Sequence, residues 1–500
     1  MRSNRISLLF LFGAGLLCSA QAQQKTIHDY IAQAPFSMPD IPVPSFPAKD
    51  FLITDYGASG NGKTLNTDAF EKAITACSAA GGGRVVVPKG VWLTGPVKMQ
   101  SNVNLHLEKD ALVQFTSDHT QYPIIHAGNS SGSFTPASPV YGYDLSNIAI
   151  TGEGVFDGAG ESWRPVKKSK MTPDQWRDIT RKGIVSRDGS VWWPTSDAMD
   201  GEDYLKKLRT KTAKPEAADY LPARDYLRPY MVYFVNCTNV LLKGVTIRNS
   251  PKFVFYPNHC TNLVMDHVNI FNDWWAQNGD GIDISACRNV AIYACTVNAG
   301  DDGICMKSSG SKNDAPGAFD LENILVAGCI VFRAHGGFVI GSNTDGGMHN
   351  IYVTDCNYIG TDVGIRVKSN AGRGGLVRDI YIDNIHMQNI VTDAISFDTY
   401  YEDVPAGKTI DSVRTTVRDK TPVFTDFHIS HISCIGAARA ITMTGLPEMP
   451  VKRIFFDDMD ITANKGFTGT DVEDIFLKNV RMHAPEPLFH NTRAKNVQVL

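Results

Sequence analysis

Residues 278–307 read NGDGIDISACRNVAIYACTVNAGDDGICMK, and two near-copies of one short pattern stand 22 residues apart within them. The copies begin Asp-Gly-Ile at Asp280 and at Asp302, and each joins a turn-forming glycine to alternating apolar residues, which is typical of a strand. The acidic residues of the two copies are Asp280, Asp283, Asp301 and Asp302. Taken alone, such a group fits a solvated turn, a cation site or an acid/base pair.

The sequence around these copies carries an internal repeat, in which a polar residue precedes a short alternating apolar run. The repeated polar positions are Asn147, Asn239, Asn262, Asn289, Asn323, Asn350, Asp379, Asp426, Asp474 and Asn496. Most steps between them lie near 22 to 34 residues, which indicates a solenoid. The leucine pattern of leucine-rich repeats and the spacing of helical repeats are both absent. We therefore predict an all-β fold, a right-handed parallel β-helix, with Asn side chains stacked at one turn.

A single helix is predicted before the repeats. Apolar residues recur with helical spacing between Ala69 and Cys77, and Gly81–Gly83 follow. Asn66, Thr67 and Asp68 precede them, and their side chains are expected to cap the helix. One short helix ahead of a long β region predicts an N-terminal cap that covers the unpaired edge of the first coil.

A second series of strands runs through the same repeats and opens at Gly281, Gly303, Gly337 and Gly364. Because side chains alternate along a strand, the apolar members face the core and the intervening ones face outward. The predicted outward set is Asp283, Asp301, Lys307, His335, Asp362, Arg366 and Lys368. Asp280 and Asp302 fall at the turn just before the strand. Acids, a histidine and bases on adjacent coils favour a functional groove over a merely solvated face.

The chain is predicted to have three parts. Residues 1–22 have the charged start, the apolar stretch and the small-residue cleavage site of a signal peptide, so we expect an exported protein, periplasmic or secreted. Residues 23–50 form a proline-rich lead-in segment on the surface. Residues 51–500 form one β-helix domain with an insertion at about 160–230, which is rich in Trp, Lys and Arg and has a small helix near residues 172–181. The insertion is either part of the binding face or a surface decoration.

Composition excludes several partners and cofactors. Forty-eight Lys and Arg against 52 Asp and Glu give no attraction to nucleic acid or to membranes, and we expect a monomer. No Cys-x-x-Cys pair is present, which argues against a zinc knuckle, and we expect no cofactor. Nine cysteines follow the signal peptide, at repeat-like spacings, and buried, stacked free thiols are the favoured interpretation.

Paired carboxylates in a groove suit glycosidic hydrolysis, in which one acid protonates the leaving oxygen and another carboxylate activates water. Crowding of the like charges raises at least one pKa, as a general acid requires. Arg366 and Lys368 on the same face favour an anionic substrate, and uronic acid sugars fit this requirement.

Four motifs appear in order: Asn278-Gly279-Asp280, Gly300-Asp301-Asp302, His335-Gly336-Gly337 and Arg366-Val367-Lys368. In these motifs, and over about residues 50 to 500, the chain resembles glycoside hydrolase family 28, the polygalacturonase family. The family's usual forms are Asn-Thr-Asp, Gly-Asp-Asp, Gly-His-Gly and Arg-Ile-Lys. Gly279 therefore replaces Thr and Ala334 replaces the first Gly of Gly-His-Gly, but neither change removes a proposed catalytic group.

The resemblance implies an inverting hydrolase of pectic α-1,4-galacturonosyl linkages that needs no metal. It implies that Asp301 is the general acid, that Asp280 and Asp302 hold the attacking water, and that His335 supports the acid. It implies substrate contacts by Arg366 and Lys368, and we add Asn278, Lys307 and an active-site tyrosine matched by Tyr400 or Tyr401, of which we choose Tyr400. The insertion resembles additions that close one end of the groove in exo-acting relatives, so an exo-acting enzyme is expected.

Three alternatives remain open. A calcium-dependent pectate lyase shares the β-helix and would use the same acids as ligands. A rhamnogalacturonan-type hydrolase is less favoured, because such relatives commonly change the second acid of the pair and lack the Arg, whereas Asp302 and Arg366 are both present here. A non-catalytic glycan-binding β-helix is the third.

Overall fold

The structure is a computed structural model that describes residues 25–126, 134–309, 319–402, 417 and 419–500. The predicted signal peptide, residues 1–22, lies outside the described residues. Within the described part, none of the helices has both the length and the apolar character needed to cross a membrane.

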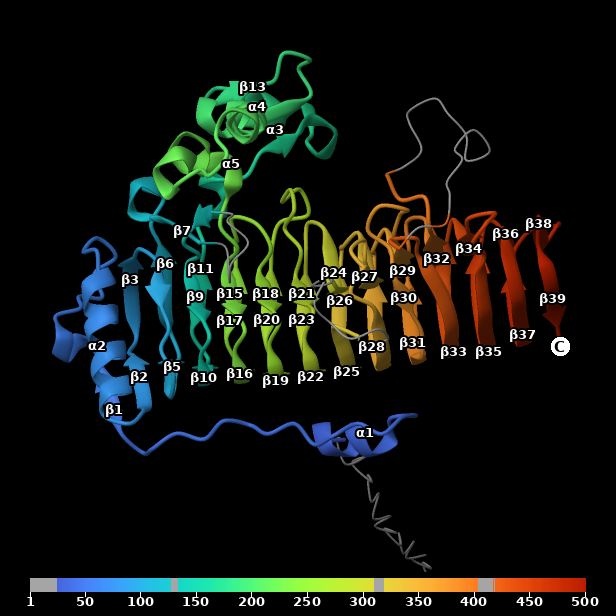
Figure 1. The fold of residues 1–500 in the computed structure, drawn as a ribbon, viewed down its shortest axis with the longest axis horizontal. Coiled ribbons are helices and arrows are strands. Elements are labelled where there is room, and N and C mark those ends of the chain that lie inside the picture. The colour runs from blue at the N-terminus through green and yellow to red at the C-terminus, as the bar shows by residue number, and fades with distance from the viewer. Residues whose placement is uncertain (1–24, 127–133, 310–318, 403–416, 418) are drawn as a thin grey trace, which may run out of the picture.

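The strands form a parallel solenoid, seen edge-on in Figure 1, which confirms the predicted all-β parallel β-helix. One sheet carries the functional groove on its outer face. Its strands, in chain order, are β4 (Val97–Lys98), β9 (Val140–Tyr143), β15 (Val232–Val235), β18 (Phe255–Asn258), β21 (Ile282–Ser285), β24 (Asp302–Lys307), β27 (Gly336–Ile340), β29 (Val363–Lys368), β32 (Asp393–Asp398), β34 (Arg439–Thr444), β36 (Phe467–Thr470) and β38 (Phe489–Thr492).

The remaining coil strands form a second, larger sheet of two columns. The first column is β1 (Asp50–Leu52), β2 (Gly83–Val87), β5 (Val103–Leu107), β10 (Ser146–Gly152), β16 (Thr238–Lys243), β19 (Thr261–Asp266), β22 (Arg288–Tyr293), β25 (Leu321–Ala327), β28 (Met348–Ile359), β31 (Ile380–Gln388), β33 (Val423–Ala437), β35 (Val451–Ala463), β37 (Val472–His483) and β39 (Lys495–Val499), with β30 (Leu376–Val377) between β28 and β33. The second column is β3 (Gly90–Thr94), β6 (Ala111–Phe115), β11 (Val155–Asp157), β17 (Thr246–Arg248), β20 (Asn269–Phe271), β23 (Thr296–Asn298) and β26 (Ile330–Phe332). The columns merge because β28 pairs with both β25 and β26.

Strand register places equivalent positions of successive coils beside one another. Ile282 pairs with Ile304, Ile304 with Phe338, and Phe338 with Ile365. All four side chains are fully buried inside the solenoid. Residues that alternate with them face outward, as the period of two requires.

The predicted Asn ladder is present at the turn that begins the first column. The side-chain amide of Asn262 donates to Asn239, Asn289 donates to Asn262, and Asn323 donates to Asn289, over 3.0 to 3.1 Å. These residues have φ near +57°, a left-handed conformation that Asn tolerates better than other non-glycine residues. The ladder therefore satisfies both the turn geometry and the amide groups.

The N-terminal cap also forms as predicted. Helix α2 (Thr67–Ala79) buries its apolar side against the first coil and ends before Gly81, whose φ is +88°. One detail of the prediction was wrong. Asn66 is the N-cap residue, but its side chain bonds the backbone of Ser59, Thr64 and Leu93 instead of the helix.

The lead-in segment lies along the outer face of the larger sheet, below the solenoid in Figure 1. It contains a helix that the sequence did not predict, α1 (Ile27–Gln33), with a capping box between Thr26 and Asp29. Tyr30 and Ile31 of this helix are buried, and the Tyr30 hydroxyl donates to Asp355 over 2.8 Å. The segment thus covers apolar sheet surface rather than merely lying beside it.

The insertion rises above the N-terminal half of the groove sheet (Figure 1). It contains the predicted small helix, α3 (Pro173–Ile179), and two further helices, α4 (Ser196–Lys211) and α5 (Arg224–Leu227). Its small sheet consists of β12 (Val166–Lys167), β13 (Ile184–Val185) and β14 (Val191–Trp193). Short 3₁₀ turns complete it: η3 (Gly160–Ser162), η4 (Lys168–Lys170) and η5 (Ala217–Ala223). Before the insertion, β7 (Ile124–His126) pairs antiparallel with β8 (Phe134–Pro136), after the turn η2 (His119–Gln121). Near the start of the solenoid, the turn η1 (Ile53–Tyr56) follows β1.

The nine cysteines of the described chain are free and buried, which agrees with the predicted stacked thiols. Cys237, Cys260 and Cys287 occupy equivalent positions in successive coils and contact one another. Burial raises the pKa of the Cys434 thiol to about 12, so thiolate chemistry is disfavoured there.

Candidate active site

Three carboxylates meet on the outer face of the groove sheet where β21 and β24 begin. Asp280 precedes β21, Asp302 is the first residue of β24, and the pairing of Ile282 with Ile304 sets them in adjacent coils. Asp280, Asp301 and Asp302 each offer an oxygen atom, and these atoms lie within 4.8 Å of one another. Such a cluster is able to hold a water molecule or a cation.

Gly300 allows the turn that carries Asp301 and Asp302. A Cβ atom at this position would lie 2.5 Å from the carbonyl oxygen of Asp273 and 2.6 Å from that of Ala276. No side chain fits there, so glycine is required for the two acids to approach the neighbouring coil.

Asp302 is held as a buried anion. Lys368 Nζ donates to one of its oxygens over 2.7 Å, and Arg366 Nη1 donates to the other over 3.4 Å. Burial alone would raise the pKa of this carboxyl, but the charges of Lys368, Lys307 and Arg366 outweigh burial and lower it far below its ordinary value. Asp302 is therefore ionised under all ordinary conditions.

Asp280 has the opposite electrostatics. It is 4% exposed, and its Oδ1 atom has no hydrogen-bond partner among the described residues. Lys307 Nζ approaches the other oxygen only to 3.6 Å. Burial, followed by repulsion from Asp283 and Asp301, raises the pKa of Asp280 well above its ordinary value. The raised pKa that the sequence predicted from carboxylate crowding is found at Asp280, but burial is its larger cause.

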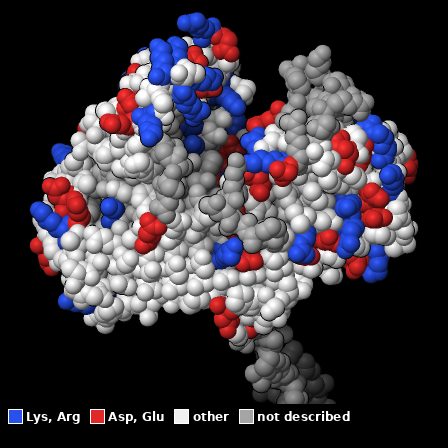
Figure 2. Space-filling model, viewed as in Figure 1, with Lys and Arg blue, Asp and Glu red and all other residues white. Residues whose placement is uncertain are grey.

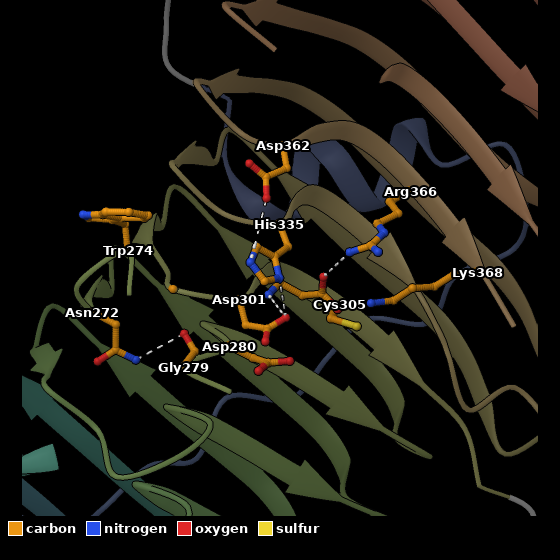
Figure 3. Close-up of polar contacts among 12 residues, drawn as sticks. Asn272, Trp274, Gly279, Asp280, Asp301, Cys305, His335, Asp362, Arg366 and Lys368 are labelled. Atoms are coloured by element: carbon orange, nitrogen blue, oxygen red, sulfur yellow. Dashed lines mark hydrogen bonds and ion pairs between the residues drawn. The ribbon is translucent and has the colours of Figure 1, made fainter. Parts of the chain in front are cut away.

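Asp301 faces His335, as Figure 3 shows. The imidazole Nδ1 atom lies 3.0 Å from Asp301 Oδ1, and the Nε2 atom lies 3.8 Å from Asp362. Burial would raise the pKa of Asp301, but the hydrogen bond from His335 and the charge of Lys368 more than offset burial, and the pKa lies below its ordinary value. The residue predicted as general acid thus has a lowered pKa in the substrate-free site.

Lys170, from the insertion, reaches this histidine and was missed by the sequence analysis. Its Nζ atom lies 3.1 Å from His335 Nε2, and it also donates to the carbonyl oxygens of Trp274 and Gly300. An ammonium has no acceptor, so Nε2 accepts from Lys170 and Nδ1–H donates to Asp301. The signal available in the sequence was only the basic run Lys167-Lys168-Ser169-Lys170, which does not specify a partner.

Lys307 and Asp283, both predicted to face outward, form a buried ion pair with 2.9 Å between Nζ and Oδ1. Asp283 is fully buried, so the structural interpretation of this acid is favoured over a groove-lining one. The Lys307 side chain is 13% exposed, and its ammonium is engaged by Asp283 and Cys305. The substrate contact proposed for Lys307 stays a prediction. The Lys307 ammonium is already paired with carboxylates of the site.

Asn278 is held in the loop before Asp280 by a residue of the insertion's end. Arg228 Nη2 donates to the Asn278 side-chain oxygen over 2.8 Å, and Nη1 donates to the carbonyl oxygen of Gln277. Burial lowers the pKa of Arg228 to about 10. The amide nitrogen of Asn278 remains for another partner.

Two tyrosines border the cationic side of the site. Tyr400 is buried and lines a cavity of about 490 Å³ together with Arg366 and Lys368. The ring of Tyr401 lies 4.8 Å from Lys368 Nζ and 5.6 Å from the Arg366 guanidinium carbon. Both tyrosines are thus near Arg366 and Lys368, the cations predicted to bind the substrate. Tyr401 is the one whose ring stacks on them. A second cavity, of about 330 Å³, is lined by Lys170, Trp274, His335 and Asp362.

Comparison with known proteins identifies the family of this chain. The model of glycosyl hydrolases family 28 matches residues 223–473, which include all four motifs. The chain belongs to this family. It is 28% identical over 439 residues to an exo-poly-alpha-D-galacturonosidase of Dickeya chrysanthemi, spanning 86% of this chain and 70% of that protein.

Two further comparisons agree. A probable polygalacturonase of Vitis vinifera is 25% identical, but the match covers 68% of this chain and only 60% of the grape protein. The crystal structure of a hyperthermoactive exopolygalacturonase from Thermotoga maritima superposes with a TM-score of 0.69 at 26% identity, covering 93% of this chain and 95% of that one.

This family 28 member departs from the usual Asn-Thr-Asp motif at Gly279 for a steric reason. A Cβ atom there would lie 2.7 Å from Ala276 Cβ and 2.9 Å from the side-chain nitrogen of Asn272. Asn272 is buried and bonds both Ser250 and the Gly279 carbonyl oxygen. The glycine therefore preserves the close folding of this loop on itself, and Asn272 links the loop to Ser250 of the preceding coil.

Proposed function

We propose that the protein hydrolyses α-1,4-galacturonosyl linkages of pectic poly- or oligosaccharides by a single displacement with inversion. The observation that carries this proposal is the union, on one outer sheet face, of three clustered carboxylates with the cations Arg366 and Lys368. Paired carboxylates suit glycosidic cleavage, and a guanidinium beside an ammonium suits a uronate.

Asp302, held ionised, is the carboxylate best prepared to accept a proton from water, with Asp280 as the second group that positions it. Asp301 is the proposed general acid, oriented by the hydrogen bond from His335. Arg366 and Lys368 are the proposed ligands of the substrate carboxylate at the cleavage point, and Asn278 and Tyr400 are proposed to contact the sugar.

The lowered pKa of Asp301 is compatible with this role because the substrate changes it. The positive charge of Lys368 is one cause of the low value. A galacturonate carboxylate bound at Lys368 and Arg366 neutralises that charge and excludes water, and both changes raise the pKa of Asp301. Asp280, with its raised pKa, supplies a protonated carboxyl within the same cluster.

Exo action is proposed from the insertion. Lys170 and Arg228 connect it to the catalytic histidine and to the Asn278 loop, so its mass adjoins the acids on the N-terminal side of the groove. Figure 2 shows the hollow beside the insertion. A wall at this place limits how many sugar units fit on one side of the cleaved bond.

Digestion of polygalacturonate tests the proposal. We expect saturated mono- or digalacturonate as the early products, and Asp301→Asn to lose more than 99% of turnover while Asp110→Asn, a surface change, keeps it. Mid-length oligomers at early times would refute exo action. Unsaturated products that absorb ultraviolet light and disappear with a chelator would instead identify a calcium-dependent lyase that uses the acid cluster as ligands.

We also propose that the protein is exported, on the basis of the leader pattern in residues 1–22. Mass spectrometry of the protein from its native host should find an N-terminus just after Ala22. An intact Met1 in the mature protein would contradict export by cleavage.

A further inference from the structure

The line of acids continues toward the insertion as a line of aromatic rings. The pairing of Val232 with Phe255, and of Phe255 with Ile282, places Tyr230 and Phe253 in the two coils before Asp280, at the same turn. Their ring centroids are 5.2 Å apart, and both rings are partly exposed. Aromatic rings in a groove are suited to pack against the apolar faces of sugars.

Lys252 lies on these two rings. Its Nζ atom is 4.9 Å from the Tyr230 centroid and 5.7 Å from the Phe253 centroid. The Lys252 ammonium makes no hydrogen bond and no ion pair with any residue that the structure describes. Lys307 and Lys368 differ from Lys252, because Lys307 bonds Asp283 and Lys368 bonds Asp302. Lys252 is therefore a groove ammonium with three free donors.

The positive charge of Lys252 is disfavoured in the protein, and a bound anion would stabilise it. Burial, with the neighbouring charge of Arg228, lowers the pKa of Lys252 to about 8. Asp280 and Asp283 oppose the shift but lie beyond ion-pair distance, and both are engaged with Lys307. A carboxylate brought to Lys252 would supply the missing hydrogen-bond acceptor and counter-charge.

Lys252 and the Arg366–Lys368 pair come from coils on opposite sides of the acids. Lys252 precedes β18, two coils before β24, and Arg366 and Lys368 lie on β29, two coils after it. Coils are spaced by about 4.8 Å, so the backbone positions of these residues lie about 10 Å along the axis from that of Asp302. The Lys368 and Arg366 side chains reach back to the Asp302 carboxylate, whereas Lys252 makes no such contact. A polyuronate carries a carboxylate on every unit, so a chain bound across the acids presents carboxylates on both sides.

We propose that Lys252, with Tyr230 and Phe253, forms a second uronate-binding site, which holds a galacturonate unit on the insertion side of the cleaved bond. This inference rests on the proposed function and adds to it a specificity-determining residue outside the four motifs. Since Arg228 and Tyr230 follow directly from the insertion, the same segment that closes the groove also builds this site.

Titration calorimetry with trigalacturonate tests the site in the inactive Asp301→Asn background. We expect Lys252→Met to weaken binding by about 10- to 100-fold, the value of a charged hydrogen bond, and Lys252→Arg to restore most of it. In the active enzyme, Lys252→Met should raise KM more than it lowers kcat. Lys243→Met removes a lysine from the opposite sheet and should change neither value.

A matched ligand separates recognition from a structural effect. Trigalacturonate that is fully methyl-esterified lacks the carboxylates, so Lys252→Met should weaken its binding by less than twofold. Equal weakening for acid and ester, or no weakening for either, would overturn the inference. Should Lys252→Met fail to fold, Lys252→Gln gives the same comparison. A wild-type enzyme that does not cleave polygalacturonate would refute the proposed function, whereas cleavage with unchanged binding by the variant would refute only this site.

Discussion

At the scale of single residues, the site separates two adjacent carboxyl groups into opposite electrostatic states. Asp302 is stabilised as an anion by Lys368 and Arg366. Asp280, one coil away, is buried, one of its oxygens has no hydrogen-bond partner in the described part of the chain, and its pKa is raised. The pKa values of the two acids differ because Lys368 and Arg366 reach Asp302 and bond it. A pair with divergent pKa values is the arrangement that acid–base chemistry requires.

Asp280→Asn tests the raised pKa through stability. Below the ordinary aspartate pKa of about 3.9, the carboxyl is protonated in both the folded and the unfolded protein and costs nothing. As the pH rises toward the raised folded-state pKa, the unfolded state releases its proton first and the wild-type protein loses stability. We expect the variant to exceed the wild type in urea resistance at pH 7 and to match it near pH 3. Its activity should fall by roughly 10²- to 10⁴-fold.

Asp302→Asn is the matched control and has the opposite sign. The lowered pKa of Asp302 contributes stability above the ordinary pKa, and this contribution is lost as the pH falls toward the folded-state value. The variant should therefore be less stable than the wild type at pH 7, with the difference narrowing below about pH 4. An Asp280→Asn variant that is also less stable at pH 7 would contradict the raised pKa.

Lys170 is expected to act as a positioning residue through His335. Lys170→Met removes the donor to Nε2, so the imidazole loses its fixed tautomer. It also removes a positive charge that interacts with Asp301, which raises the pKa of that acid. We expect kcat to fall about tenfold, KM for trigalacturonate to change less, and the pH optimum to move upward. Lys168→Met, which removes an ammonium beside Trp176, is the control. An unchanged pH profile would reduce Lys170 to a purely structural contact.

At the scale of elements, the sequence predicted the repeated coils but missed several elements that occur once. The solenoid and the Asn ladder follow from local periodicity, because each coil repeats the same turn and alternation. Helix α2 follows from the helical spacing of its apolar residues, and the four motifs were identified by their resemblance to a known family. Helix α1 and helix α4 escaped because α1 is only 7 residues long in a proline-rich segment and α4 belongs to a non-repeating insertion. The roles of Lys170 and Lys252 were not predicted, because tertiary contacts decide which side chains surround each of them.

The Asn ladder should carry measurable stability. Asn289→Ala removes two ladder hydrogen bonds, to Asn262 and from Asn323, and places a Cβ-bearing residue without side-chain support at φ +57°. Hydrogen bonds of about 1 kcal/mol each and about 1–2 kcal/mol of backbone strain predict a loss of about 3–4 kcal/mol in urea unfolding. Asn289→Gly relieves the strain and should cost only the hydrogen bonds. Equal losses for the two variants would show that backbone conformation plays no part.

At the scale of the whole molecule, charge is divided between the insertion and the solenoid. Residues 160–230 contain 15 Lys and Arg against 11 Asp and Glu, a net charge of +4, whereas the entire chain has −4. Figure 2 shows Lys and Arg side chains gathered on the insertion, beside the hollow. A polyanionic substrate is therefore attracted to one end of a molecule whose remainder repels it.

Ionic strength should consequently control activity on the polymer. The screening length falls from about 10 Å at 0.1 M salt to about 3 Å at 1 M, so we expect kcat/KM for polygalacturonate to fall at least several-fold over this range. The charge of Lys167 is felt at Lys170, so the double variant Lys167→Gln/Lys168→Gln should show a weaker salt dependence. Lys206→Gln/Lys207→Gln removes the same charge from α4, where Lys206 already pairs with Glu202, and should leave the dependence nearly unchanged. Equal effects of the two double variants would mean that only net charge matters and that the basic face beside the groove does not guide the substrate.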